Sequence, residues 1–210
     1  MIVKFQHRGA KQNLLKIGAL ILAAGSSRRF GGDKRRSRLP SGEAVLETTI
    51  TKVNPHFAEI LVVLRHGDLN LAEVLQNKFR GLLTFLAPDS ALGMGHSLAD
   101  GIKQVQHWQA SAIFMGDMPF IQPQTIDLLL DQHNLHESSQ PIIVPSYRNQ
   151  AGHPVIFSKA YYQELTALSG DEGAKSIVRR YADHVIQVPC LDRGVLDDID
   201  LPEDLNHPSE

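Results

Sequence analysis

Short apolar runs and longer amphipathic segments alternate along most of this chain. The apolar runs are typical of strands buried on both faces of a sheet, and they lie at 19–23, 59–64, 82–86, 111–115 and 141–145. The segments with apolar residues at helical spacing lie at 43–53, at 68–78 with Asp68 as a candidate N-cap, at 97–108 and after Pro123. Strands that alternate with helices predict a three-layer α/β fold with a mostly parallel, Rossmann-like sheet.

The pattern changes in the last third of the chain. Residues 146–157 favour a hairpin arm or a crossing strand over another β-α-β unit. Helices are then predicted at 158–168 and 172–182, strands at 184–190 and 194–200, and a short helix at the end. Residues 1–16 have no periodicity and are interpreted as an N-terminal extension, with a candidate short strand at 2–5. Because the chain has no repeat or linker, its 210 residues predict one domain.

Composition narrows the classes of partner and compartment. The 21 basic residues nearly balance the 23 acidic ones, so we expect neither a nucleic acid nor a membrane surface as partner. Cys190 is the only cysteine, which excludes an internal disulfide. No apolar stretch approaches the ~18 residues of a membrane span, and we expect a cytoplasmic protein. His133 and His136 lack a third ligand for zinc, so we expect them at the surface.

A glycine-rich, cationic loop follows the first apolar run. Its glycines at 25, 31 and 32 allow positive φ and close approach of backbone N–H groups to a ligand. Six basic residues and one acidic residue lie between 28 and 38, a local excess of five positive charges. A solvated basic surface is the simpler interpretation of such a run, and a polyphosphate site is the functional one. The spacing fits neither a P-loop nor a dinucleotide fingerprint.

The residues of this loop follow a known signature in order. They match L-x-(A/G)-G-x-S-x-R-(M/F)-G-x-(D/P)-K at Leu22, Ala24, Gly25, Ser27, Arg29, Phe30, Gly31, Asp33 and Lys34. The stretch resembles the nucleotidyltransferases of the molybdenum cofactor branch, which have a glycosyltransferase-A-like fold. The resemblance implies that Arg29 and Lys34 neutralise charge in catalysis. It also implies a triphosphate-binding loop formed by Leu22, Ala23, Ala24, Gly25, Ser27 and Gly31.

Acidic residues after two further apolar runs are candidate metal ligands. Asp117 follows the run at 111–115, where it is either a turn former or a ligand for Mg²⁺, which prefers carboxylates and substrate phosphates. The Gly-Asp-Met-Pro segment resembles the family signature and implies the metal role. Asp198 and Asp200 would face the same side of a strand, so either could complete the site. Asp200 also resembles a helix cap, with Glu203 three residues later.

Other segments resemble the family's substrate-binding motifs. The resemblance places Gly95 and Ser97 near the base and ribose, although Ser97 is equally suited to capping the helix that follows. Acceptor-side motifs are matched at Gly152, His153, Asp171 and Lys175, with lysine at 175 where arginine is more usual. A departure from the family pattern follows the signature, where three arginines replace the leucines of many relatives, at Arg35, Arg36 and Arg38.

The resemblance implies a Mg²⁺-dependent nucleotidyltransferase without a protein nucleophile. An acceptor phosphate would attack the α-phosphorus of a nucleoside triphosphate, and pyrophosphate would leave. In the family, Leu-Ala-Ala-Gly at 22–25 accompanies cytosine, and Leu-Ala-Gly-Gly accompanies guanine. The implied substrates are therefore CTP, in preference to GTP, and molybdopterin. Transfer to a sugar or alditol phosphate, and nucleotide binding without turnover by a regulatory protein, are the alternatives.

Overall fold

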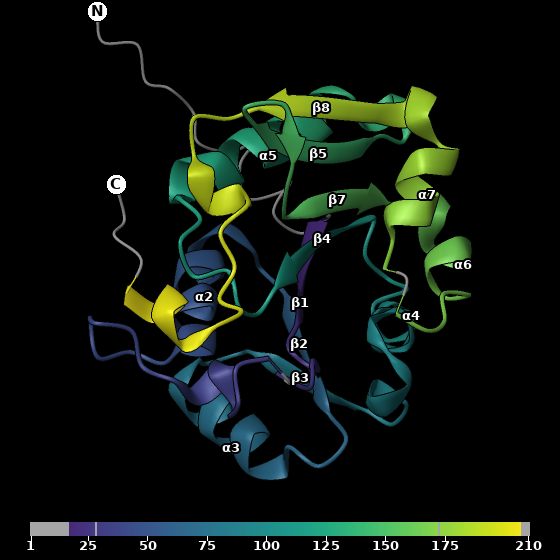
Figure 1. The fold of residues 1–210 in the computed structure, drawn as a ribbon. Coiled ribbons are helices and arrows are strands. Elements are labelled where there is room, and N and C mark those ends of the chain that lie inside the picture. The colour runs from purple at the N-terminus through teal and green to yellow at the C-terminus, as the bar shows by residue number, and fades with distance from the viewer. Residues whose placement is uncertain (1–16, 28, 172, 207–210) are drawn as a thin grey trace, which may run out of the picture.

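The computed structural model describes residues 17–27, 29–171 and 173–206. An eight-stranded sheet forms its centre, with the strand order β3-β2-β1-β4-β7-β5-β6 and β8 paired with β5 (Figure 1). The first half is parallel and consists of β1 (Ile17–Leu22), β2 (Ile60–Arg65), β3 (Leu83–Ala87) and β4 (Ala110–Met115). These strands coincide with the first four apolar runs to within a few residues, and the predicted extension at 1–16 lies outside the described residues.

The second half of the sheet contains the crossing strand that the sequence predicted. Strand β7 (Val155–Ser158) is antiparallel to both β4 and β5 (Ile142–Tyr147). A short hairpin joins β5 to β6 (Gln150–Ala151), and β8 (Val185–Pro189) runs parallel to β5. The mostly parallel sheet and the α/β fold class are therefore confirmed.

Helices cover both faces of the sheet (Figure 1). One face packs against α2 (Val45–Val53), α3 (Leu69–Lys78) and α5 (Pro123–Leu135). The other packs against α4 (Met94–Gln104), α6 (Tyr162–Leu165) and α7 (Lys175–Arg180). Short 3₁₀ helices lie at Lys34–Arg36, Asn54–His56, Ser90–Leu92, Glu137–Ser139, Lys159–Tyr161, Ala182–His184, Arg193–Val195 and Pro202–Asn206. None of the described helices is long and apolar enough to cross a membrane.

Strand β1 shows why its sequence is apolar throughout. Its side chains alternate between the two faces, so that Ile21 packs in the core beneath α2 and α3 while Leu20 and Leu22 pack in the core beneath α4. All six residues of the strand are buried. The same alternation continues past the strand and places Ala24 in the core on the α4 side.

The strand predicted at 194–200 does not form. A 3₁₀ helix at Arg193–Val195 replaces its start, because the buried Asp192 carboxylate accepts hydrogen bonds from Gly194 N–H and Gln122 N–H, both at 2.8 Å. The remaining residues are irregular. They cross the carboxyl end of the sheet, where Ile199 N–H donates to the Asp117 carbonyl oxygen at 3.0 Å.

Two polar residues also differ from their predicted settings. His133 is buried, and its Nε2 lies 3.1 Å from Ser158 Oγ. Desolvation lowers the pKa of His133 to about 4, so the surface position expected for it is wrong. Asp68 occupies the N-cap position of α3 but makes no capping hydrogen bond with its side chain. Its carboxylate is engaged by Arg35 instead.

Candidate active site

Three segments meet at the carboxyl ends of β1 and β4. Gly116 N–H, after β4, donates to Leu22 O at the end of β1 over 2.8 Å. A Cβ added at Gly116 would lie 2.9 Å from Ala23 Cβ, so a larger residue would push the two loops apart. The bond from Ile199 to Asp117 adds the third segment. The edge of a parallel sheet, outside the carboxyl ends of adjacent strands, is where α/β proteins bind ligands.

Three carboxylates cluster at this junction. Asp117, Asp198 and Asp200 each offer one oxygen atom within 4.8 Å of the others, close enough to hold a metal ion. Burial raises the pKa of Asp198, and the charges of Asp117 and Asp200 raise it further. Among the described residues, no hydrogen-bond donor reaches the buried Asp117 Oδ1. Carboxylate oxygens in such a group suit a hard divalent cation.

Lys34 reaches two of these carboxylates from the first loop. Its Nζ lies 2.5 Å from Asp117 Oδ2 and 3.1 Å from Asp200 Oδ1. Burial alone would lower the pKa of Lys34, but the charges and hydrogen bonds of Asp117 and Asp200 outweigh burial and raise it. Lys34 is therefore held as an ammonium group against the acidic cluster.

Arg29 contacts the same cluster from outside. Its Nη1 lies 3.0 Å from Asp200 Oδ2, and its side chain is 80% exposed. Hydrogen bonds from Lys34 are the main reason that the pKa of Asp200 is lowered. The Asp200 carboxylate accepts from Lys34 and Arg29 in place of the predicted helix N–H groups. The N–H groups of Asp200 and Leu201 donate to Asp204 Oδ2 at 2.9 and 2.7 Å. An exposed ion pair contributes little to stability, so Arg29 can exchange Asp200 for an anionic ligand at little cost.

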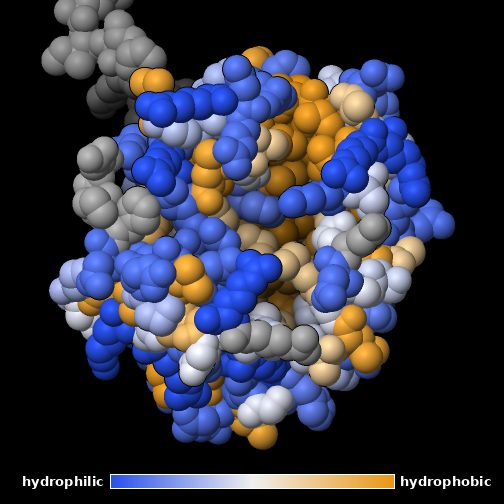
Figure 2. All heavy atoms as spheres, viewed as in Figure 1, coloured by the Kyte–Doolittle hydropathy of each residue, from blue (hydrophilic) through white to orange (hydrophobic). Residues whose placement is uncertain are grey.

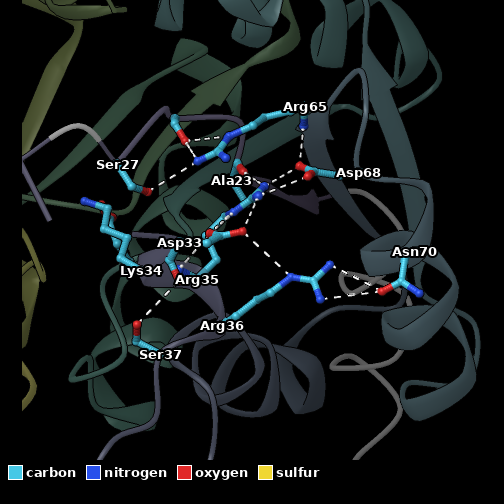
Figure 3. Close-up of polar contacts among 12 residues, drawn as sticks. Ala23, Ser27, Asp33, Lys34, Arg35, Arg36, Ser37, Arg65, Asp68 and Asn70 are labelled. Atoms are coloured by element: carbon cyan, nitrogen blue, oxygen red, sulfur yellow. Dashed lines mark hydrogen bonds and ion pairs between the residues drawn. The ribbon is translucent and has the colours of Figure 1, made fainter. Parts of the chain in front are cut away.

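The first loop has the open backbone expected of an anion site. Ser27 and Gly31 have φ values of 52° and 74°, and a Cβ added at Gly25 or Gly31 would meet no atom within 4 Å. Arg65, at the end of β2, donates from Nε to Gly25 O at 2.9 Å and from Nη2 to Ser27 Oγ at 3.3 Å (Figure 3). In contrast, the side chains of Leu22, Ala23 and Ala24 are buried in the core.

The cationic run is not a uniform basic surface. Arg35 is only 3% exposed and binds the carboxylates of Asp33 and Asp68. Figure 3 shows the side chains of Lys34 and Arg35 diverging, with the Arg35 guanidinium toward Ala23 and Asp68. Arg36 is half-exposed, 3.7 Å from Asp33. Sequence reasoning treated Arg35 as part of the loop's positive surface, and no local signal revealed that Asp68, thirty-three positions later, would neutralise it.

The predicted base-side and acceptor-side segments lie against each other. Gly95 N–H, in the first turn of α4, donates to Gly170 O at 2.8 Å, and a Cβ on Gly93 would come within 2.6 Å of Asp171 Oδ1. Ser97 is buried inside α4, where its Oγ donates to Gly93 O at 3.4 Å. The capping alternative for Ser97 is wrong, because α4 begins three residues earlier than predicted.

His153 and Lys175 are the remaining predicted acceptor-side residues, and of the two His153 is close enough to Asp117 to feel its charge. His153 N–H donates to Val195 O at 2.8 Å, and Gly152 packs so closely that an added Cβ would lie 2.2 Å from the same oxygen. Burial lowers the pKa of His153, against the opposing effect of Asp117 and with a smaller contribution from the charge of Lys175. His153 is thus a neutral imidazole, and its buried Nδ1 has no partner within the described part of the chain. Lys175 and Asp171 are exposed.

The surface beside these residues is hollowed and apolar. Figure 2 shows an orange depression between β8 and α7, over the strands of the sheet and bordered by hydrophilic residues. The depression borders α7, whose first residue is the predicted acceptor-side Lys175. Such an arrangement can hold a charged ligand beside a larger, partly apolar one.

Comparison with known proteins identifies the family of this chain. A family described as the MobA-like NTP transferase domain matches residues 19–185, most of the chain. The chain belongs to this family. Purine catabolism protein PucB of Bacillus subtilis is 27% identical over 199 residues, which span 88% of this chain and 92% of that protein. A molybdenum cofactor guanylyltransferase of Shewanella sp. strain ANA-3 is 38% identical over 90 residues, 41% of this chain and 45% of that protein.

Solved structures share the fold of this MobA-like chain. The Rv0371c homologue from Mycobacterium sp. strain JC1 has a TM-score of 0.75 at 25% identity, covering 90% of this chain and 92% of that one. Rv0371c of Mycobacterium tuberculosis in complex with manganese has a TM-score of 0.64 at 22% identity, covering 91% and 94%. The predicted nucleotidyltransferase activity is thereby confirmed at the level of the family.

Proposed function

We propose that this MobA-like protein transfers CMP from CTP to a phosphorylated acceptor, with Mg²⁺, and releases pyrophosphate. The observation that carries the proposal is the contact of Lys34 Nζ with Asp117 at 2.5 Å and with Asp200 at 3.1 Å. This contact brings the end of the glycine-rich loop onto the acidic cluster. A triphosphate over the loop would therefore lie beside the residues that can hold a cation.

The chain's own residues divide the work by position. The open backbone around Gly25 and Gly31 would donate N–H groups to the phosphates, and Lys34 and Arg29 would neutralise charge on the leaving pyrophosphate. Asp117, with Asp198 or Asp200, would hold Mg²⁺, which supplies charge neutralisation and orients phosphate oxygens. No protein nucleophile is required, because phosphoryl transfer of this kind depends on positioning and electrostatics.

The preference for CTP over GTP rests on Ala24. The alternation of β1 places Ala24 on the same face as α4, whose first turn contains the predicted base-side Gly95. A methyl group at this position would crowd a purine more than a pyrimidine. Relatives of this chain are named molybdenum cofactor guanylyltransferase, that is, after transfer of a guanine nucleotide. The activities with CTP and with GTP must therefore be compared directly.

Molybdopterin is the acceptor that the proposal favours. The apolar depression between β8 and α7, the helix that begins at the predicted acceptor-side Lys175, suits a ring system (Figure 2). A methyl-erythritol phosphate is the second candidate, since 4-diphosphocytidyl-2C-methyl-D-erythritol synthase of Anaerococcus prevotii shares the fold with a TM-score of 0.70 at 18% identity, covering 91% of this chain and 95% of that one.

The test is release of pyrophosphate from CTP and GTP with each acceptor in turn. The proposal predicts turnover with CTP, Mg²⁺ and molybdopterin, and a lower kcat/KM with GTP. Turnover only with an alditol or sugar phosphate would establish the second acceptor class. Tight binding of CTP without pyrophosphate release from any acceptor would instead indicate a regulatory nucleotide-binding protein.

A further inference from the structure

We infer that the buried guanidinium of Arg35 is a positioning residue that pins the two ends of the nucleotide-binding loop together. This inference rests on the proposed function, because it assumes that the loop between Ala23 and Asp33 binds a triphosphate. Arg35 stands next to Lys34 in a 3₁₀ helix, yet its guanidinium contacts Ala23 O and the Asp68 carboxylate (Figure 3), whereas Lys34 contacts Asp117 and Asp200. Its role is therefore distinct from that of its neighbour.

All five N–H groups of Arg35 have partners. Nε and Nη2 each donate to the Asp33 carboxylate at 2.7 Å, and Nη1 donates to Ala23 O at 2.8 Å. The remaining N–H groups of Nη1 and Nη2 reach the Asp68 carboxylate, the latter at 3.1 Å. Only a planar, forked side chain has five donors in this arrangement, so lysine could not replace it.

The three partners of Arg35 belong to three separate segments. Ala23 O lies at the start of the loop, just after β1, and Asp33 lies at its end, just before Lys34. Asp68 lies between β2 and α3 and also accepts Arg65 N–H at 3.0 Å. One side chain thus joins both ends of the loop to the fixed frame of the sheet. A loop closed in this way loses less entropy when it orders around a ligand.

The charges around Arg35 explain why it does not contribute to a basic surface. Burial would raise the pKa of Asp33, but the hydrogen bond and charge of Arg35 outweigh burial and lower it. The same contacts keep Arg35 charged despite its burial. Two carboxylates surround one guanidinium, so the positive charge of Arg35 is more than offset and does not add to the positive charge of the loop. What Arg35 gives the ligand site is the fixed position of the loop. Buried ion pairs often give little net stability, which is consistent with a role in fixing geometry.

Stability and positioning can be separated by a pair of variants. Arg35→Leu leaves the mostly buried Asp68 carboxylate without its main partner and should lower Tm. Adding Asp68→Asn removes that uncompensated charge while keeping an oxygen for Arg65 N–H, so the double variant should recover part of the lost Tm, although Asp33 still lacks its Arg35 partner. In the double variant the two ends of the loop would still lack the hydrogen bonds of Arg35 that hold them together. Arg36→Ala is the matched control, because Arg36 is adjacent, basic and half-exposed.

The experiment measures the Kd of CTP with Mg²⁺ by calorimetry, together with Tm, for the full chain and these variants. We expect Kd to rise roughly tenfold in Arg35→Leu, in Arg35→Lys and in the double variant, and less than twofold in Arg36→Ala. A double variant that regains Tm but binds CTP within twofold of the wild type would show that Arg35 acts on stability alone and overturn the inference.

The same data distinguish failure of this inference from failure of the proposed function. If the wild-type protein binds neither CTP nor GTP with Mg²⁺, the loop is not a nucleotide site and both are wrong. If the wild type binds and Arg35→Lys binds equally well, only the positioning role is wrong. If Arg35→Leu alone does not fold, Arg35→Lys and the double variant decide the question by the same Kd comparison.

Discussion

The proposed nucleotide side and the proposed acceptor side of this site are built by different means. The loop after β1 is braced by charged side chains, with Arg35 on Asp33 and Asp68, Arg65 on Gly25 O, and Lys34 on the acidic cluster. The acceptor side is held by close backbone packing around glycines, and its charged side chains at 171 and 175 are exposed. A triphosphate has one shape and charge for every member of a family, whereas acceptors vary, and the two kinds of construction reflect this difference.

Loss of the proposed metal ligand Asp117 should have the largest effect on turnover, because the metal would contact both the nucleotide and the acceptor. Asp117→Asn should keep the fold, since the Ile199 N–H bond to Asp117 uses the backbone oxygen. A neutral amide is a poor ligand for a hard dication. The activation barrier should therefore rise by about 4 kcal/mol, which lowers kcat roughly 10³-fold. Thermal unfolding and pyrophosphate release test this. If the variant keeps more than about a tenth of the wild-type kcat, the barrier has risen by less than ~1.4 kcal/mol, and the metal must bind elsewhere.

Removal of Lys34 tests whether the braced side contains one placed cation or a diffuse positive field. Lys34→Ala should lower kcat by roughly 10², more than it raises KM, because its contact strengthens as charge moves to the pyrophosphate. Arg36→Ala serves as the control, whereas the buried Arg35 cannot. Similar, salt-sensitive rises in KM for Lys34→Ala and Arg36→Ala would favour the diffuse field.

The exposed charge of the acceptor side should give a smaller and more selective effect. Lys175→Ala should raise KM for the acceptor by about tenfold and leave kcat and the KM for CTP unchanged, because a contact far from the reacting phosphorus binds the acceptor equally in the ground state and in the transition state. Arg179, which is exposed one turn later on α7, provides the control variant Arg179→Ala. An equal change in KM for both substrates would mean that the two sides are not separate.

A substitution at the proposed base-reading position, Ala24, should have the smallest effect. Ala24→Gly should raise kcat/KM for GTP relative to CTP by about 1 kcal/mol, the lower end of what one methyl group discriminates in a pocket. The measurement is the ratio of the two kcat/KM values, in which effects on stability cancel. An unchanged ratio would show that Ala24 does not read the base, and the preference for CTP would lose its support.

The sequence predicted those parts of the fold that depend on the local spacing of apolar residues. The buried strands and most helices carry their signals in the spacing of apolar residues, and Asp117 was predicted from its place after a strand. Asp198 and Asp200 were predicted from the family resemblance and from a strand that does not form, yet they lie beside Asp117. Failures occurred where distant contacts override the local pattern. Asp192 turns the chain at 194 through bonds to Gln122 and Gly194, and Asp68 draws Arg35 into the interior. Such long-range pairs leave no periodicity in one sequence.

A crystal structure of the full chain with a non-hydrolysable CTP analogue and Mg²⁺ tests the central claim most directly. The account predicts the triphosphate over the loop at 24–34, with Lys34 moved from Asp117 toward the phosphates. It also predicts the metal on Asp117 together with Asp198 or Asp200. A triphosphate bound away from this loop, or a metal that does not contact Asp117, would contradict the account.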